Sequence, residues 1–195
     1  MFSEIDHNIS KYVSFTEDEL HIFHSLVTIQ KASKKEYLLQ EGDICDFEAF
    51  VIQGCLRKYY LNEKGAEVIV PFAIEDSWIS DIASFSDHTP SHFFIEALED
   101  SELLILTPNK KNELLAKVPK FERVFRILVQ RHLSVTQDRL VNTIAKTAPE
   151  KYLDFLEHYP TIPQRVAQHY IASYLGISAE FLSKVRKKLS KPNKK

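Results

Sequence analysis

Four polar side chains that can form hydrogen bonds lie close together near the end of the sequence, in the run IASYLGISAEFLSKVRKKL (residues 171–189). Ser183, Lys184 and Lys187 follow Glu180 by three, four and seven residues, so all four lie on one face of a helix. A carboxylate accepts hydrogen bonds from base amino groups, and ammonium groups donate to guanine or neutralise phosphates. The spacing therefore predicts a face that contacts a nucleic acid.

Two short helices joined at a glycine must position that face. Gly176 supplies the positive φ that a tight turn between helices requires, and Ser178 is placed to cap the second helix. An ordinary antiparallel helix pair has the same apolar pattern, but the turn, the cap and the basic charge favour a helix-turn-helix. The inner faces of the two helices are apolar, with Ile171, Ala172 and Leu175 on the first and Leu182, Val185 and Leu189 on the second.

Charge is distributed unevenly along the chain. The 195 residues carry a net charge of −2, with 25 Lys+Arg and 27 Asp+Glu. Residues 161–195 hold eight of the basic residues and one acid, Glu180, which leaves 17 basic and 26 acidic residues in positions 1–160. An acidic body with a basic end predicts an anion-binding module in a separate domain. A basic tail that is only solvated is the alternative.

The region before the basic end predicts helices followed by strands. Residues 2–30 look helical, and Thr16 with Glu19 forms a capping box. Between about residues 33 and 107, short strand-like runs alternate with turn signals such as NEKG at residues 62–65. Five or six strands of this kind predict an antiparallel barrel or sandwich.

A long helix is predicted from Lys120 to about Lys146, where neither proline nor glycine interrupts the pattern. Its side chains recur at alternating steps of four and three residues, the spacing of a coiled-coil seam. We expect this seam to join two copies of the chain, and the alternative is a helix packed on its own barrel. The predicted seam consists of Phe121, Phe125, Leu128, His132 and Val135.

Composition excludes several classes of protein. The sequence is 44% hydrophobic, enough to bury a sizeable core, so a disordered chain is excluded. Its apolar runs are far shorter than the roughly 20 residues needed to cross a bilayer. The acidic, polar start MFSEIDHNISKY is unlike a signal peptide. We therefore expect a cytoplasmic protein with no membrane partner.

Catalytic and metal-binding motifs are not found in the sequence. Cys45 and Cys55 are the only cysteines, and they lack the CxxC clustering of a zinc or iron–sulfur site. There is no nucleophile elbow, phosphate-binding glycine loop or HExxH motif. We expect no catalytic residue, no metal and no cofactor. Two close histidine pairs are interpreted as solvated or core side chains: His21 with His24, and His88 with His92.

The run LLQEGDICDFEAFVIQGCLRKYYLNEKGAEVIVPF, a long helix and IASYLGISAEFLSKVRKKL together resemble the CRP/FNR family of bacterial transcription regulators, from about Ser14 to Leu189. The resemblance implies an α+β fold with an N-terminal antiparallel β-roll, a cyclic-nucleotide-binding-like jelly roll. We place this sensor domain at residues 1–117, a dimerisation helix at 118–146 and the helix-turn-helix domain at 147–195. The implied partners are double-stranded DNA, a second copy of the chain and RNA polymerase.

The resemblance also implies which residues meet DNA. Base-reading positions correspond to Ala179, Glu180, Ser183 and Lys184, an arrangement similar to the E-x-x-S-R pattern of the FNR branch with lysine in place of arginine. Lysine lacks the rigid two-donor fork of arginine, so the sequence preference is expected to differ. The remaining expected DNA contacts come from Arg186, Lys187 and Lys188.

The effector pocket departs from the cyclic-nucleotide-binding pattern of the family. The arginine that pairs with the cyclic phosphate is replaced by Ser91, and neither Lys nor Arg lies between Asp76 and Ala97. We therefore predict a degenerate pocket with an unidentified effector or none. A cyclic-nucleotide-responsive regulator and a barrel-fold enzyme are the alternatives. The corresponding pocket positions are Ser80, Asp81, Ile82, Ser91 and His92.

Overall fold

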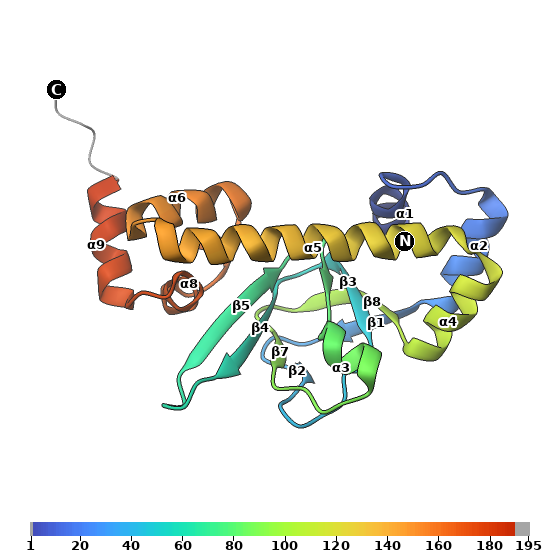
Figure 1. Ribbon diagram of the computed structural model, residues 1–195, viewed down its shortest axis with the longest axis horizontal. Helices are drawn as coiled ribbons and strands as arrows, with labels where there is room; N and C mark the ends of the chain where they lie inside the picture. Colours follow the sequence, from blue (N-terminus) through green and yellow to red (C-terminus); the bar gives the residue numbers. More distant parts are fainter. Residues whose placement is uncertain (1, 190–195) are drawn as a thin grey trace. The chain divides into compact units, whose positions relative to one another are not determined.

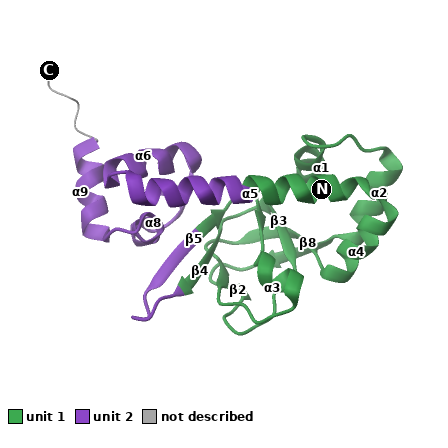
Figure 2. Cartoon of the chain, viewed as in Figure 1, with its two compact units in different colours: residues 1–60, 71–131 green, residues 61–70, 132–195 purple. Residues whose placement is uncertain are grey.

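The computed structural model describes residues 2–189 and divides into two compact units (Figure 2). Unit 1 comprises residues 1–60 and 71–131, and unit 2 comprises residues 61–70 and 132–195. The division falls inside the long helix, and it assigns the hairpin at residues 61–70 to unit 2. The boundaries predicted from the sequence, 117/118 and 146/147, lie on either side of this division.

Within residues 2–189, helices come first and last, and the strands lie between them (Figure 1). The strands are β1 (Thr28–Ala32), β2 (Tyr37–Leu39), β3 (Glu48–Gln53), β4 (Leu56–Leu61), β5 (Glu67–Ala73), β6 (Trp78–Ile79), β7 (Phe94–Ala97) and β8 (Ser101–Leu106). The helices are α1 (Ser3–Ser10), α2 (Glu17–Leu26), α3 (Ile82–Asp87), α4 (Pro108–Lys117), α5 (Lys120–Ala145), α6 (Ala148–His158), α7 (Ile162–Arg165), α8 (Gln168–Leu175) and α9 (Ala179–Leu189).

The strands form two four-stranded sheets, in the orders β1-β8-β3-β6 and β2-β7-β4-β5. β3 pairs antiparallel with β8, placing Ala49 opposite Ile105 and Phe50 opposite Leu104. β4 pairs antiparallel with β7, with Leu56 opposite Ala97. This architecture confirms the predicted α+β fold with an antiparallel barrel.

Successive side chains of β3 point alternately into the two hydrophobic cores of unit 1. Ala49 and Val51 face a cluster between the sheets, whereas Phe50 faces the opposite side, where helices cover the sheet. The cluster between the sheets includes Leu39, Phe47, Leu56, Ile95 and Leu103. The cluster beneath the helices includes Ile5, Ile9, Phe23, Leu114, Phe121 and Phe125.

Helix α2 begins as the sequence predicts. The Thr16 hydroxyl accepts a hydrogen bond from the backbone N–H of Glu19, and the Glu19 carboxylate accepts one from the Thr16 backbone N–H. The predicted capping box is therefore confirmed.

None of the helices within residues 2–189 combines the length and the apolar character needed to span a membrane.

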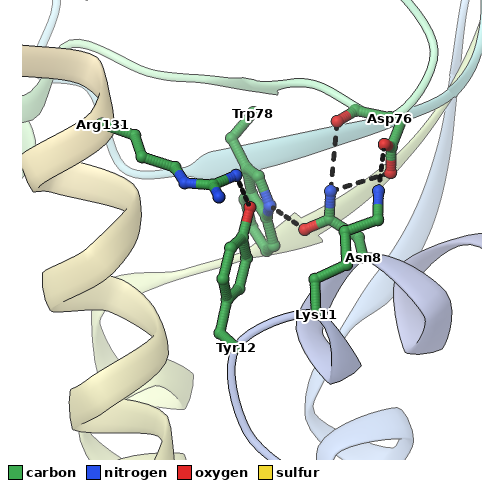
Figure 3. Close-up of polar contacts among 6 residues, drawn as sticks. All are labelled: Asn8, Lys11, Tyr12, Asp76, Trp78 and Arg131. Carbon is green, nitrogen blue, oxygen red and sulfur yellow. Dashed lines mark hydrogen bonds and ion pairs between the residues drawn. The ribbon is translucent and has the colours of Figure 1, made fainter. Parts of the chain in front are cut away.

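A polar cluster fixes α1 against the turn that precedes β6 (Figure 3). The Asn8 side-chain amide donates to the Asp76 backbone carbonyl at 3.2 Å and to its carboxylate at 2.8 Å. The Asn8 amide oxygen accepts from the Trp78 indole at 3.2 Å, and Lys11 pairs with the Asp76 carboxylate at 2.5 Å. Asn8 is only 4% exposed, so these contacts satisfy a buried amide that would otherwise be costly.

Replacing Asn8 with alanine is expected to lower the free energy of unfolding by about 1–3 kcal/mol, because the indole N–H of Trp78 loses its partner inside the protein. Trp78 is the only tryptophan, so its fluorescence in a urea titration reports the change directly. Ser10→Ala, an exposed substitution on the same helix, serves as the control. Equal midpoints for the two variants would contradict a stabilising role for Asn8.

Candidate nucleic-acid interface

The turn between α8 and α9 has the geometry that the glycine predicts. Gly176 adopts a φ of +69°, the left-handed conformation that closes the C-terminus of α8. The backbone N–H of Gly176 donates to Ser173 O at 3.1 Å, and that of Ile177 donates to Ala172 O at 3.0 Å. These bonds satisfy carbonyls at the end of α8, and a residue with a Cβ at position 176 would be strained.

Ser178 caps α9. Its hydroxyl accepts a hydrogen bond from the Phe181 backbone N–H at 3.2 Å, and its carbonyl accepts from Leu182 N at 2.9 Å. The predicted cap is therefore confirmed, and the first turn of α9 has a fixed direction.

The inner faces of α8 and α9 pack as predicted, with one exception. Leu182 and Val185 of α9 are 0% and 4% exposed, and Ile171, Ala172 and Leu175 of α8 are buried as well. α9 packs against α6 and α8. The prediction is wrong for Leu189, which is 41% exposed, because burial is confined to the first two turns of α9.

The opposite face of α9 presents the polar side chains. The structure places five predicted DNA-contacting residues at exposed positions, and Ala179 and Arg186 are half-buried at the margins. The exposed five are Glu180, Ser183, Lys184, Lys187 and Lys188. Three further lysines of the basic end, Lys191, Lys194 and Lys195, lie outside the described residues.

Glu180 is held in its charged form. Its own backbone N–H, the Ser178 hydroxyl and the positive charge of Lys184 keep the pKa of its carboxyl below the ordinary value. A charged carboxylate is a strong acceptor for a base amino group. The first turn of α9 therefore offers an acceptor next to the donor of Lys184.

Arginine at position 139, which the sequence does not single out, anchors α8 within unit 2. Its guanidinium donates to the carbonyls of Ile69, Val70 and Tyr174 and lies 4.0 Å from the Tyr174 ring centroid. Ser173 donates to Glu67 O at 2.6 Å and accepts from Ile69 N at 3.1 Å. These contacts hold the start of β5 and the end of α8 together, which fixes the helix that supports α9.

The predicted seam of the long helix is wrong in its first half. Phe121 and Phe125 are 0% and 8% exposed in the core of their own chain, and Leu128 packs partly against the same cluster. Tyr12 of the N-terminal region also contacts this face, accepting a hydrogen bond from Arg131 at 3.0 Å (Figure 3). The regular spacing identifies an apolar face correctly, but that face packs on the barrel of its own chain.

The second half of the predicted seam lies at the surface. His132 is exposed, and Val135 is 45% exposed at the edge of a cavity of about 340 Å³ between α5, α6 and α8. The cavity walls contain charges that are already partnered: Lys151 donates to Thr143 O, and Asp154 pairs with Lys146.

A different apolar stripe is exposed on the outer side of α5. Its four residues follow one another at steps of four, seven and four, so they lie along one side of the helix. The exposed fractions are 48% for Val129, 55% for Leu133, 61% for Leu140 and 80% for Ile144.

The predicted effector positions form a closed polar cluster in unit 1. Ser91 donates from its hydroxyl to the Asp81 carboxylate at 2.7 Å, and both residues are buried. Ser80 donates to Phe47 O at 2.9 Å. Two predicted pocket residues do not join the cluster in this way: Ile82 is 39% exposed, and His92 is exposed.

A cation that the sequence analysis missed completes this cluster. Lys58 of β4 is 7% exposed, and its ammonium donates to Ser80 O at 3.0 Å and lies 4.9 Å from the Phe93 ring centroid. Burial lowers the pKa of Lys58, while the negative charge of the nearby Asp81 opposes the shift. This buried cation comes from β4, 22 positions before Ser80 in the sequence, so no local motif around residues 80–92 could reveal it.

Metal binding finds no support in the described residues. Among residues 2–189, no three His, Cys, Asp or Glu side chains cluster in a way that could hold an ion. His24 instead lies 2.7 Å from the Asp6 carboxylate, joining α2 to α1. Both cysteines are buried, and neither forms a disulfide in the structure.

Comparisons with known proteins agree with this architecture. Residues 29–118 match the cyclic nucleotide-binding domain family. The fumarate and nitrate reduction regulatory protein of Vibrio cholerae is 24% identical over 184 residues, covering 88% of this chain and 73% of the relative. The transcriptional activator protein Anr of Pseudomonas protegens is 25% identical over 165 residues, covering 78% and 66%.

Solved structures share the fold. FixK2 from Bradyrhizobium japonicum superposes with a TM-score of 0.73 at 19% identity, covering 84% of each chain. The catabolite activator protein of Thermus thermophilus superposes with a TM-score of 0.58 at 20% identity, covering 91% of this chain and 85% of its own. In its fold, with the barrel, the long helix and the helix-turn-helix in this order, and in the regulators to which its sequence is similar, the chain resembles the CRP/FNR family of transcription regulators.

Proposed function

We propose that this protein is a homodimeric, DNA-binding transcription regulator that reads its operator with α9. The observation that carries the proposal is the two-sided character of this helix: Leu182 and Val185 are buried against its supports, while polar and basic side chains cover the outer face. A helix of this kind enters the major groove with its N-terminal residues toward the bases.

Individual roles follow from the chemistry of each side chain. Glu180 accepts from a cytosine amino group, and Lys184 donates to guanine O6 or N7. Ala179 and Ser183 complete the base-reading set. The remaining cations, Arg186, Lys187 and Lys188, neutralise phosphates around the reading face.

Dimerisation is proposed to use the outer stripe of α5. Val129, Leu133, Leu140 and Ile144 are large apolar side chains exposed on one helix, and a second copy of the same helix would bury them around a two-fold axis. Two copies would place two α9 helices on half-sites separated by about one turn of DNA, or a multiple of it. RNA polymerase is a further proposed partner, on the basis of the family resemblance alone.

The barrel is proposed to work without a cyclic nucleotide. Lys58 already occupies the polar cluster formed by Ser80, Asp81 and Ser91, and the Asp81 carboxylate opposes a second anion there. A barrel-fold enzyme is not proposed, because the relatives are named as a regulatory protein and a transcriptional activator.

Cyclic AMP and cyclic GMP are therefore expected to leave the melting temperature of the protein unchanged at about 1 mM, whereas a ligand at 100 times its Kd would add about 2.7 kcal/mol of stability. Thermal melting with and without each nucleotide makes the test. Concentration-dependent stabilisation by either one would favour the alternative, a cyclic-nucleotide-responsive regulator.

DNA reading by α9 is tested with two lysines of the same helix. Lys184→Ala is expected to cost about 1–3 kcal/mol on the operator and much less on random DNA, because a base contact is lost. Lys188→Ala should weaken binding to both duplexes alike and make the slope of log K against log salt shallower by about one.

The measurement is a salt titration of the wild type and both variants on an operator selected from random duplexes and on unselected DNA. Equal losses on both duplexes for Lys184→Ala would contradict base reading at that position. The two lysines lie on one helix and are both exposed, so each variant controls for the loss of a charge.

A further inference from the structure

The third residue of α9 is a large apolar side chain at the surface. Phe181 is 47% exposed, although the next residue, Leu182, is fully buried. Its backbone N–H is held by the Ser178 hydroxyl at 3.2 Å, so the ring leaves the helix from a fixed first turn. Among residues 2–189, no aromatic ring or cation stacks on it in the structure.

Cations surround this ring on the helix. Lys184 and Lys188 follow Phe181 by three and seven residues, which places both on its side of α9, and Glu180 precedes it. An apolar protein partner would have to cover these ammonium groups, at a desolvation cost. An anionic polymer that also carries apolar groups matches the surface better.

DNA is such a polymer. Among the groups that base edges present in the major groove, the C5-methyl of thymine is the apolar one, and aromatic rings are among its known protein contacts. Recognition helices contact base edges with their N-terminal residues, and Phe181 lies in the first turn of α9. We infer that Phe181 is a specificity-determining residue that packs against the methyl group of one thymine in each half of the operator.

This inference rests on the proposed DNA-binding function and adds an apolar contact to its polar readers. Glu180 and Lys184 select bases through hydrogen bonds, whereas Phe181 selects thymine over cytosine through a methyl group that cytosine lacks. 5-Methylcytosine carries a methyl group at the same ring position. We therefore expect 5-methylcytosine, placed where Phe181 contacts thymine, to restore part of the affinity that unmethylated cytosine loses.

The experiment replaces each operator thymine in turn with deoxyuridine, which keeps the base pair and removes only the methyl. The full-length protein is used with an operator selected from random duplexes. At one thymine in each half-site, the wild type is expected to bind the deoxyuridine duplex about fourfold more weakly, the effect of losing one buried methyl. Phe181→Ala is expected to bind both duplexes equally at that position.

Two further variants separate the proposed methyl contact from a general effect of removing an exposed apolar side chain. Phe181→Leu keeps an apolar side chain and should keep part of the preference for thymine. Leu153→Ala removes another exposed apolar side chain, 50% exposed on α6 of the same unit, and should respond to deoxyuridine as the wild type does. Circular dichroism and thermal melting establish that each variant is folded.

Each other outcome overturns the inference in a distinguishable way. If the wild type and Phe181→Ala respond identically at every thymine, Phe181 does not read a methyl, while the proposed function stands. If Phe181→Ala weakens all duplexes alike, the ring contacts the DNA backbone instead. If no operator can be selected and all duplexes bind equally, sequence reading by α9 fails, and the inference fails with it.

Discussion

Leu133→Glu and Leu140→Glu are each expected to convert the protein from a dimer to a monomer and to lower its affinity for the operator by about 10²- to 10⁴-fold. The side chains are 55% and 61% exposed on the outer stripe of α5, so a glutamate does not disturb the core of its own chain. In a dimer it would place two like charges near the two-fold axis. The loss of affinity follows because a monomer binds one half-site without the high effective concentration that the linked second copy supplies.

Ser134→Glu provides the matched control, since Ser134 is exposed on the same helix but lies off the stripe. It should remain dimeric and bind the operator as the wild type does. Multi-angle light scattering at micromolar concentration gives the mass, and a DNA titration gives the affinity. A monomeric wild type, or dimeric glutamate variants, would contradict the role of the stripe.

The outer stripe of α5 illustrates what helical periodicity can and cannot establish. The steps of four and three residues through Phe121, Phe125 and Leu128 mark a real apolar face, but a coiled-coil partner and a barrel of the same chain need the same spacing. The exposed stripe has a similar period, but it is less continuously apolar, because the polar Thr136 lies between Leu133 and Leu140. Only the tertiary structure shows which of the two faces packs on the barrel of its own chain.

Local rules predicted the helix-turn-helix well. The conformation of Gly176, the cap by Ser178 and the capping box at Thr16 each depend on residues within four positions of one another, so the sequence contains all the information they need. Burial at the end of α9 was predicted less well, because Leu189 continues the apolar period beyond the turns that are packed.

Contacts between distant segments could not be predicted in this way. Arg139 reaches carbonyls about 70 positions earlier in the chain, and Lys58 reaches Ser80 across the barrel. A search limited to residues 76–97 finds neither Lys nor Arg, because the buried lysine comes from β4. Phe181 was missed for another reason: it adjoins Leu182 of the apolar inner face in the sequence, and only its 47% exposure shows that its ring lies at the surface.

Lys58→Met and Asp81→Asn are each expected to lower the free energy of unfolding by about 3–5 kcal/mol, because each leaves the opposite charge buried without its counterpart. Lys58 and Asp81 are 7% and 6% exposed, and the charge of Asp81 favours the protonated lysine. The double variant should recover most of this loss, since it removes both charges together. Lys64→Met, at an exposed position, should change stability by about 0.5 kcal/mol or less.

The measurement is urea denaturation of the four variants and the wild type. A double variant no more stable than the weaker single variant would show that the two charges do not stabilise one another. Recovery in the double variant would instead support an electrostatic coupling between the two buried charges, because removing both leaves neither of them uncompensated.

The pH dependence of the same variants tests the charge state of Lys58. Burial lowers the pKa of Lys58 in the folded protein, so between that lowered pKa and the ordinary value of 10.5 the unfolded chain binds more protons than the folded one. This lysine's contribution to stability therefore rises with pH across that window and is constant below it. We expect the wild type to gain stability relative to the double variant Lys58→Met/Asp81→Asn as pH rises through the window, because that variant has no titrating lysine there. A constant difference would mean that the pKa of Lys58 is not lowered, and that its ammonium is solvated rather than enclosed by the barrel.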